Sequence, residues 1–117
     1  MKPVKNFTLW VESDRVKVRF VGAKRLGRLT KDAGWATGGS YTHKDRIIRL
    51  PRYEYRGTLR AALLHELGHH LFKRQELKVS RITEEDVCDM LTWLPSILTD
   101  KRNKKLRRFL FEEVPGQ

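Results

Sequence analysis

Two segments near the N-terminus place apolar side chains at every second position, which is the spacing of β-strands with one buried face. Residues 7–11 and 16–20 follow this pattern, and the polar stretch 12–15 between them predicts a β-hairpin. Two shorter runs, 41–43 and 46–50, flank a polar turn and predict a second hairpin. All the strands that we expect therefore lie in the first half of the chain.

The second half of the chain has the apolar spacing of helices. Residues 59–73 contain no proline and follow Thr58, the predicted N-cap. A second helix should begin at Thr83, with Asp86 three residues later as its capping-box partner. A last, basic helix is predicted over about 101–113.

The second helix carries an apolar stripe that we expect to face the core, formed by Val87, Leu91, Leu94 and Leu98. Pro95 falls within this stripe and should kink or interrupt the helix. Residues 23–30 are predicted as a further short basic helix. Because strands come first and helices last, the sequence predicts an α+β fold over 1–117, one domain with a small antiparallel sheet packed on helices.

His65, Glu66 and His69 form an HExxH motif inside the predicted helix 59–73. Residues four apart lie one turn apart and about 40° around the helix axis, so both imidazoles can reach one metal ion. Glu66 is rotated by about 100° from His65, which suits a carboxylate that activates metal-bound water and does not bind the metal. His70 points toward the leucine side of the helix and is interpreted as structural.

A helical wheel divides this helix into two faces. The histidine face is lined mostly by small residues, which leaves room for an ion and a substrate: Ala61, Ala62 and Gly68, with Phe72. The opposite face should pack into the core through Leu59, Leu63, Leu64, Leu67 and Leu71.

A catalytic zinc ion takes three protein ligands and keeps one position open for water. No histidine follows His70, so a third ligand downstream must be a carboxylate or Cys88. The acidic start of the second helix is the obvious source. The helical wheel favours Glu84, whereas Glu85 precedes Asp89 by one turn, so that Asp89 would orient a histidine ligand by a hydrogen bond. We favour Glu85 as the third ligand, with Glu84 as the alternative.

Three elements follow one another in the chain: a short strand at 47–50, the helix from Thr58 through the HExxH motif to Phe72, and the start of the next helix at 84–87. In this order they resemble compact HExxH zinc metallopeptidases, gluzincin-like proteins of the ImmA/IrrE type, above all small phage-encoded members. The resemblance covers about half of the chain, from about 39 to 98. The residues that follow Glu85 depart from the family pattern, and the basic C-terminal helix has no counterpart in it.

The resemblance implies a minimal zincin-like fold and one Zn²⁺ ion held by His65, His69 and a glutamate at 84–85. Glu66 would then be the general base, taking a proton from zinc-bound water and passing it to the leaving amine. The implied reaction is hydrolysis of peptide bonds in a protein or peptide substrate. An extended substrate would add to the strand at 46–50. Candidates for the oxyanion donor, by residue type alone, are Tyr41, His43, Tyr53 and Tyr55.

Charge and composition add a second line of inference. Lys and Arg number 25 against 14 Asp and Glu, which gives a net charge of +11. Such a charge attracts polyanions, and the C-terminal cluster is a candidate for non-specific nucleic-acid binding: Lys101, Arg102, Lys104, Lys105, Arg107 and Arg108. The longest apolar run is four residues, 61–64, so a membrane protein is not expected. A single cysteine, Cys88, fits a reducing, cytoplasmic compartment.

Two classes of function are therefore compatible with the sequence. One is a zinc-dependent metallopeptidase; the other is a non-enzymatic basic module that binds or regulates a nucleic acid or a protein, with a structural metal or none. They differ at Glu66, which hydrolysis requires and a structural metal site does not.

Overall fold

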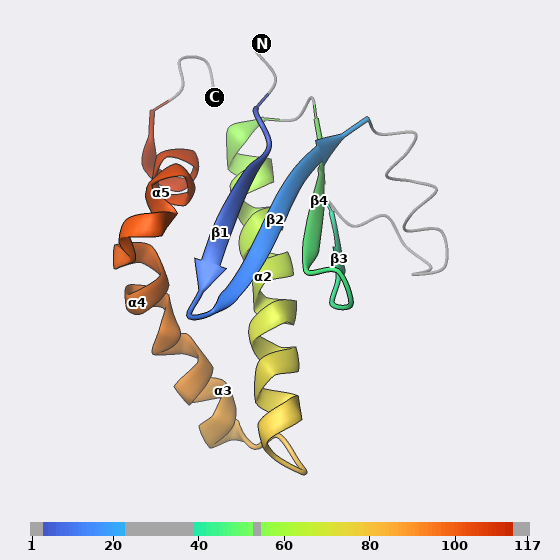
Figure 1. Ribbon diagram of the computed structural model, residues 1–117, viewed down its shortest axis with the longest axis vertical. Coiled ribbons are helices and arrows are strands. Elements are labelled where there is room, and N and C mark those ends of the chain that lie inside the picture. The colour runs from blue at the N-terminus through green and yellow to red at the C-terminus, as the bar shows by residue number, and fades with distance from the viewer. Residues whose placement is uncertain (1–3, 23–38, 53–54, 114–117) are drawn as a thin grey trace.

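The computed structural model describes residues 4–22, 39–52 and 55–113, in which strands precede helices as predicted. The strands are β1 (Phe7–Val11), β2 (Asp14–Val21), β3 (Ser40–Thr42) and β4 (Ile47–Pro51). The helices are α2 (Arg56–Lys78), α3 (Glu84–Leu91), α4 (Trp93–Thr99), the 3₁₀ turn η2 (Lys101–Asn103) and α5 (Lys104–Phe111). Figure 1 shows α2 along one face of the sheet and the α3–α5 segment returning beside β1. The α+β class is confirmed.

Both predicted hairpins are present. β1 pairs antiparallel with β2, and β3 pairs antiparallel with β4. Alternate residues of β1 and β2 are buried, as the apolar spacing predicts, so one face of this hairpin lines the core. The predicted helix at 23–30 lies outside the described residues.

The sheet is mixed, which corrects the expectation of a purely antiparallel one. Its order is β1-β2-β4-β3, and β2 pairs with β4 in parallel. Residues 22–46 separate these two strands, and a connection of this length permits the crossover that parallel pairing needs. Because β4 has a partner on each side, it cannot accept an extended substrate as the sequence suggested. The free edges of this sheet are β1 and β3.

Helix α2 packs its leucine face against the sheet. Leu59, Leu63, Leu67 and Leu71 are buried as predicted, and each buried leucine side chain contributes about 1.5–3 kcal/mol through the hydrophobic effect. Leu64 is 46% exposed, so the prediction was wrong for this residue. The helix also begins earlier than expected, with Tyr55 as an N-cap that makes no side-chain hydrogen bond, so Thr58 lies inside the helix.

The predicted second helix begins as expected but divides into α3 and α4. Thr83 and Asp86 form the predicted capping box at its start. The helix then breaks at Thr92, and Pro95 lies in the first turn of α4, where its missing N–H costs no helical hydrogen bond. No helix in the described ranges is long and apolar enough to cross a membrane.

The apolar stripe predicted for this region is wrong in its first half. Val87 is 45% exposed and Leu91 is 63% exposed. Thr92 belongs to neither α3 nor α4, so one continuous helix does not carry the stripe. Leu98 packs against the core as predicted, and the other side chains of this region that reach the core are Met90, Trp93 and Ile97.

The basic C-terminal helix is confirmed in a shorter form, as η2 followed by α5. Leu106, Phe109 and Leu110 anchor α5 in the core. Asn103 is buried and joins η2 to the free edge of β1: its Nδ2 donates to the Trp10 carbonyl at 2.8 Å, and its Oδ1 accepts from the Trp10 amide at 2.7 Å. The C-terminal segment is therefore fixed against the first strand.

Candidate metal centre

The two histidines of the HExxH motif lie on the solvent-exposed face of α2. Their Nε2 atoms are 3.2 Å apart, and their rings meet nearly edge to face with centroids 4.8 Å apart. Together with Glu66 they offer three ligand atoms that all lie within 4.8 Å of one another. In the part of the chain that the structure describes, this is the group of histidine, cysteine and acidic side chains that could hold a metal ion.

The distance between the two Nε2 atoms fits joint coordination of one ion. Two imidazole nitrogens bound tetrahedrally at 2.0–2.1 Å are about 3.3 Å apart, as in zinc sites. The observed 3.2 Å agrees with this value without any change of side-chain rotamer. One turn of helix therefore places both donors, as the i, i+4 spacing predicts.

Glu66 lies between α2 and the sheet and is 3% exposed. Burial raises the pKa of its carboxyl group, an effect that His69 and His65 counteract. Gly39, directly before β3, lies beside Glu66: a Cβ atom on Gly39 would be in ordinary contact with Glu66 Cγ at 3.5 Å, but it would lie only 2.7 Å from Leu50 Cδ2 and 2.9 Å from the Arg49 carbonyl oxygen. The close approach of this backbone to β4 thus requires a glycine.

His70 is structural, as the sequence suggested. It is completely buried, with Nε2 3.1 Å from Asp14 Oδ2 and Nδ1 2.6 Å from the Tyr41 hydroxyl. Burial lowers the pKa of His70 to about 4, so the ring is neutral at pH 7. A carboxylate only accepts hydrogen bonds, so we assign the N–H to Nε2, donating to Asp14, while Nδ1 accepts from Tyr41.

Among the described candidates for the oxyanion donor, Tyr41 and His43 have hydrogen-bond partners outside the HExxH motif. The Tyr41 hydroxyl donates to His70, and its second partner is His43 Nδ1 at 2.9 Å. Burial raises the pKa of Tyr41 to about 12, so it remains protonated. Tyr55 is 63% exposed at the start of α2, and Tyr53 lies outside the described residues.

The proposed third ligands are separated from the histidines. Glu84 and Glu85 are exposed on the first turn of α3, and neither belongs to the group formed by the HExxH motif. α3 is tied to α2 by the hydrogen bond from Gln75 Nε2 to Asp86 Oδ1, at 2.7 Å. Gln75 lies six residues beyond His69, about 9 Å along the helix axis. The structure thus brings together the motif but not the glutamate that we expected to complete it.

Asp89 also lies apart from the motif. Its side chain is exposed and makes no hydrogen bond to a histidine among the described residues. Its expected role as an orienting partner therefore depends on the same rearrangement that Glu85 would need.

The six C-terminal cations differ in their surroundings. Arg107 donates to the carbonyl oxygens of Leu98 and Asp100, and so stabilises the end of α4. Lys101 is exposed on η2. The other four, Arg102, Lys104, Lys105 and Arg108, line a pocket together with residues of β1 and β2.

Comparison of this chain with family models, with curated proteins and with solved structures finds no match. The functional assignment accordingly depends on the geometry of the HExxH motif and its surroundings.

Proposed function

We propose that this protein is a zinc-dependent metallopeptidase that hydrolyses peptide bonds of a protein or peptide substrate, with a minimal zincin-like fold. The observation that carries the proposal is the pair of imidazole Nε2 atoms 3.2 Å apart on an exposed helix face, with a buried carboxylate beside them. Imidazole and carboxylate are the ligands that zinc takes in catalytic sites. Zinc, when bound, supplies a Lewis acid that polarises the substrate carbonyl and acidifies water.

In this proposal Glu66 is the general base. It is the residue next to His65, and its side chain is buried beside Gly39. Glu66 accepts a proton from the attacking water and returns it to the leaving amine nitrogen. Third-ligand coordination by Glu85, or by Glu84, stays a prediction and requires α3 to approach the histidines.

The free edge of the sheet supports a peptide as the substrate. β3 pairs with β4 on one side, and its other side faces no strand in the described part of the chain. Gly39 lies beside Glu66, and Tyr41 contacts His70, so β3 follows α2 for one helical turn. A peptide that adds to β3 as a further strand would run past the motif. This replaces β4 as the expected docking strand.

A second candidate is a non-enzymatic module with a structural metal. The specific observation in its favour is that Glu66 belongs to the same 4.8 Å group as the two histidines. If Glu66 were itself the third ligand, no base would remain, and the ion would stabilise the fold.

One substitution distinguishes the two candidates. Glu66→Gln removes the base but keeps its shape, so we expect it to retain about one bound zinc and to lose the hydrolysis of unfolded casein by about 10²–10⁴-fold. The matched control is Glu76→Gln on the exposed surface of α2, which should alter neither property. Metal content is measured by elemental mass spectrometry. Loss of zinc from Glu66→Gln would favour the structural site, and equal cleavage by both variants would contradict the peptidase proposal.

A further inference from the structure

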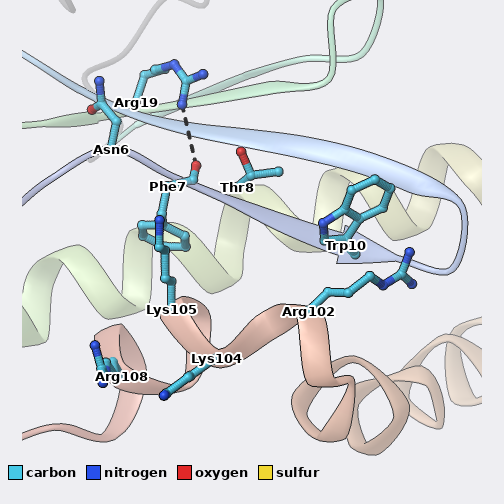
Figure 2. A pocket seen from close by; sticks show the side chains of 9 residues that line it. All are labelled: Asn6, Phe7, Thr8, Trp10, Arg19, Arg102, Lys104, Lys105 and Arg108. Carbon is cyan, nitrogen blue, oxygen red and sulfur yellow. Dashed lines mark hydrogen bonds between the residues drawn. The ribbon is translucent and has the colours of Figure 1, made fainter.

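A basic groove lies between strand β1 and the C-terminal segment η2–α5, with a volume of about 700 Å³. Nine residues line it; five are Lys or Arg, and none is acidic. Figure 2 shows these cations gathered around β1: Arg19, Arg102, Lys104, Lys105 and Arg108. We call it the β1–α5 groove. β1 is the sheet edge opposite β3, so the groove is separate from the HExxH motif and the inference does not depend on the proposed function.

The walls of the groove are fixed by long-range contacts. Asn103 binds both backbone groups of Trp10, which ties η2 to the strand. Phe7 and Phe109 also pack against each other, with ring centroids 5.5 Å apart, which ties α5 to the same strand. Because both contacts join residues distant in sequence, the fold sets the position of the two walls of the groove.

Three of the cations have no partner that would explain their positions. The side chains of Lys104, Lys105 and Arg108 make no ion pair or hydrogen bond with other described residues, whereas Arg102 is paired with Asp100 at 2.8 Å. Lys104 and Lys105 occupy the first turn of α5, where the helix dipole disfavours positive charge. Lys104 and Arg108 are also like charges four residues apart, which destabilises a helix. Helix stability therefore does not account for this arrangement, whereas an anionic ligand would.

A planar surface lies beside these charges. The Arg102 guanidinium stacks over the Trp10 ring, 4.5 Å from its centroid, and the Arg102 side chain is 45% exposed. Stacked aromatic and guanidinium planes accept nucleobases in single-stranded nucleic-acid sites. An acidic peptide would use the charges but not the planar surface. The volume of about 700 Å³ lies within the range of about 300–1,000 Å³ that is typical of small-ligand sites, and the charges and the planar surface decide which ligand fits.

We propose that the β1–α5 groove binds single-stranded nucleic acid, with Lys104, Lys105 and Arg108 on the phosphates and the Trp10–Arg102 pair beneath a base. The contacts are to backbone and base face, so binding is independent of sequence. The HExxH helix takes no part in it.

The test is fluorescence anisotropy of the full-length, folded protein with a labelled 20-nucleotide oligo-dT. With three or four phosphates neutralised, the logarithm of the binding constant should fall with the logarithm of salt with a slope of about −2 to −3. Between 50 and 200 mM salt, binding should then weaken by roughly 20- to 50-fold. The triple variant Lys104→Gln, Lys105→Gln, Arg108→Gln should bind the oligonucleotide more than about tenfold more weakly. Its salt-dependence slope should be less steep by about 2.

The control removes equal charge elsewhere. Lys44, Lys73 and Arg81 lie outside the groove, and changing all three to Gln gives the same net charge as the groove variant. We expect affinity within about threefold of the unchanged protein, since long-range attraction is screened beyond about 10 Å at 0.1 M salt. Trp10→Leu should weaken binding about fivefold or more without changing the salt slope, because stacking releases no counterions.

Three results would overturn the proposal. Equal losses in the groove variant and the charge-matched control would show attraction by net charge alone. Competition by polyglutamate as strong as by oligo-dT would show an acidic-peptide site. Tighter binding of a duplex of the same length would show a double-strand surface. Circular dichroism checks that each variant is folded, and Lys105→Gln alone, with an expected loss of about fivefold at 0.1 M salt, replaces the triple variant if that variant unfolds.

Discussion

His69 and His70 are neighbours in sequence but belong to opposite faces of α2. His70 is completely buried, and each of its ring nitrogens has a protein partner, Asp14 or Tyr41. His69 is exposed, and its Nε2 meets only the Nε2 of His65 among the described residues. His69 thus offers a ring nitrogen to a ligand, whereas both ring nitrogens of His70 are already in use.

This difference distinguishes a histidine of the candidate metal site from a histidine that stabilises the fold. A buried imidazole needs partners for both nitrogens, because an unsatisfied polar group costs about 1–3 kcal/mol. Asp14 provides one and is itself held by Arg74 and Arg46. Burial alone would raise the pKa of Asp14, but the Arg74 hydrogen bond and the surrounding charges lower it, so the carboxylate stays ionised. On the HExxH face, the described residues give the Nε2 atoms of His65 and His69 a hydrogen bond only to each other, and a bound metal ion would replace this single contact.

The largest effect that we expect is on zinc affinity, which should distinguish the motif histidines from His70. His65→Ala or His69→Ala removes a direct ligand, so zinc affinity should fall by more than the roughly 100-fold that loss of an outer hydrogen-bond partner costs. His70→Ala should change zinc affinity far less, because neither ring nitrogen faces the motif. Competition with a zinc-binding dye measures all three. A larger loss of affinity in His70→Ala than in His69→Ala would reverse the assignment.

The next effect concerns stability. His70→Ala leaves Asp14 and Tyr41 without their shared partner and opens a cavity beneath β3, so the free energy of unfolding should fall by about 2–4 kcal/mol. His69→Ala, made without zinc present, should lower it by less than about 0.5 kcal/mol, as is usual at an exposed position. Urea denaturation measures both values. Similar losses for the two variants would mean that the two histidines do not differ in role.

The smallest effects compare two glycines. Gly39→Ala places a methyl group 2.7 Å from Leu50 Cδ2 and 2.9 Å from the Arg49 carbonyl oxygen, so the start of β3 must shift away from β4. We expect a loss of about 1–3 kcal/mol of stability and a parallel loss of peptidase activity. Gly68→Ala, within α2, meets nothing within 4 Å and should stabilise the helix by about 1 kcal/mol. Thermal unfolding should thus shift in opposite directions, and a shift of the same sign would contradict this account.

Features that depend on local spacing could be predicted from the sequence. The alternation in β1 and β2, the leucine face of α2 and the capping box of Thr83 with Asp86 all involve residues a few positions apart. The convergence of His65 and His69 belongs to the same class, because one helical turn sets it.

Features that depend on tertiary contact could not be predicted. The parallel pairing of β2 with β4 joins strands that residues 22–46 separate in sequence, and the helix expected from Thr83 is interrupted at Thr92. Gly39 gives only a loop signal in sequence, although it is the residue over Glu66. The third ligand was expected at the start of α3, Glu84 from the helical wheel and Glu85 from its spacing to Asp89, and it stays a prediction. Local spacing carries no information on where α3 meets α2, a contact that includes Gln75 and Asp86.

Elemental mass spectrometry of the native protein, purified without chelators or added metal, tests the central claim most directly. The account predicts about one zinc ion per chain, lost from the double variant His65→Ala, His69→Ala while the circular dichroism spectrum stays that of a folded protein. Metal content near zero in the native protein, or an equal content in the double variant, would contradict it.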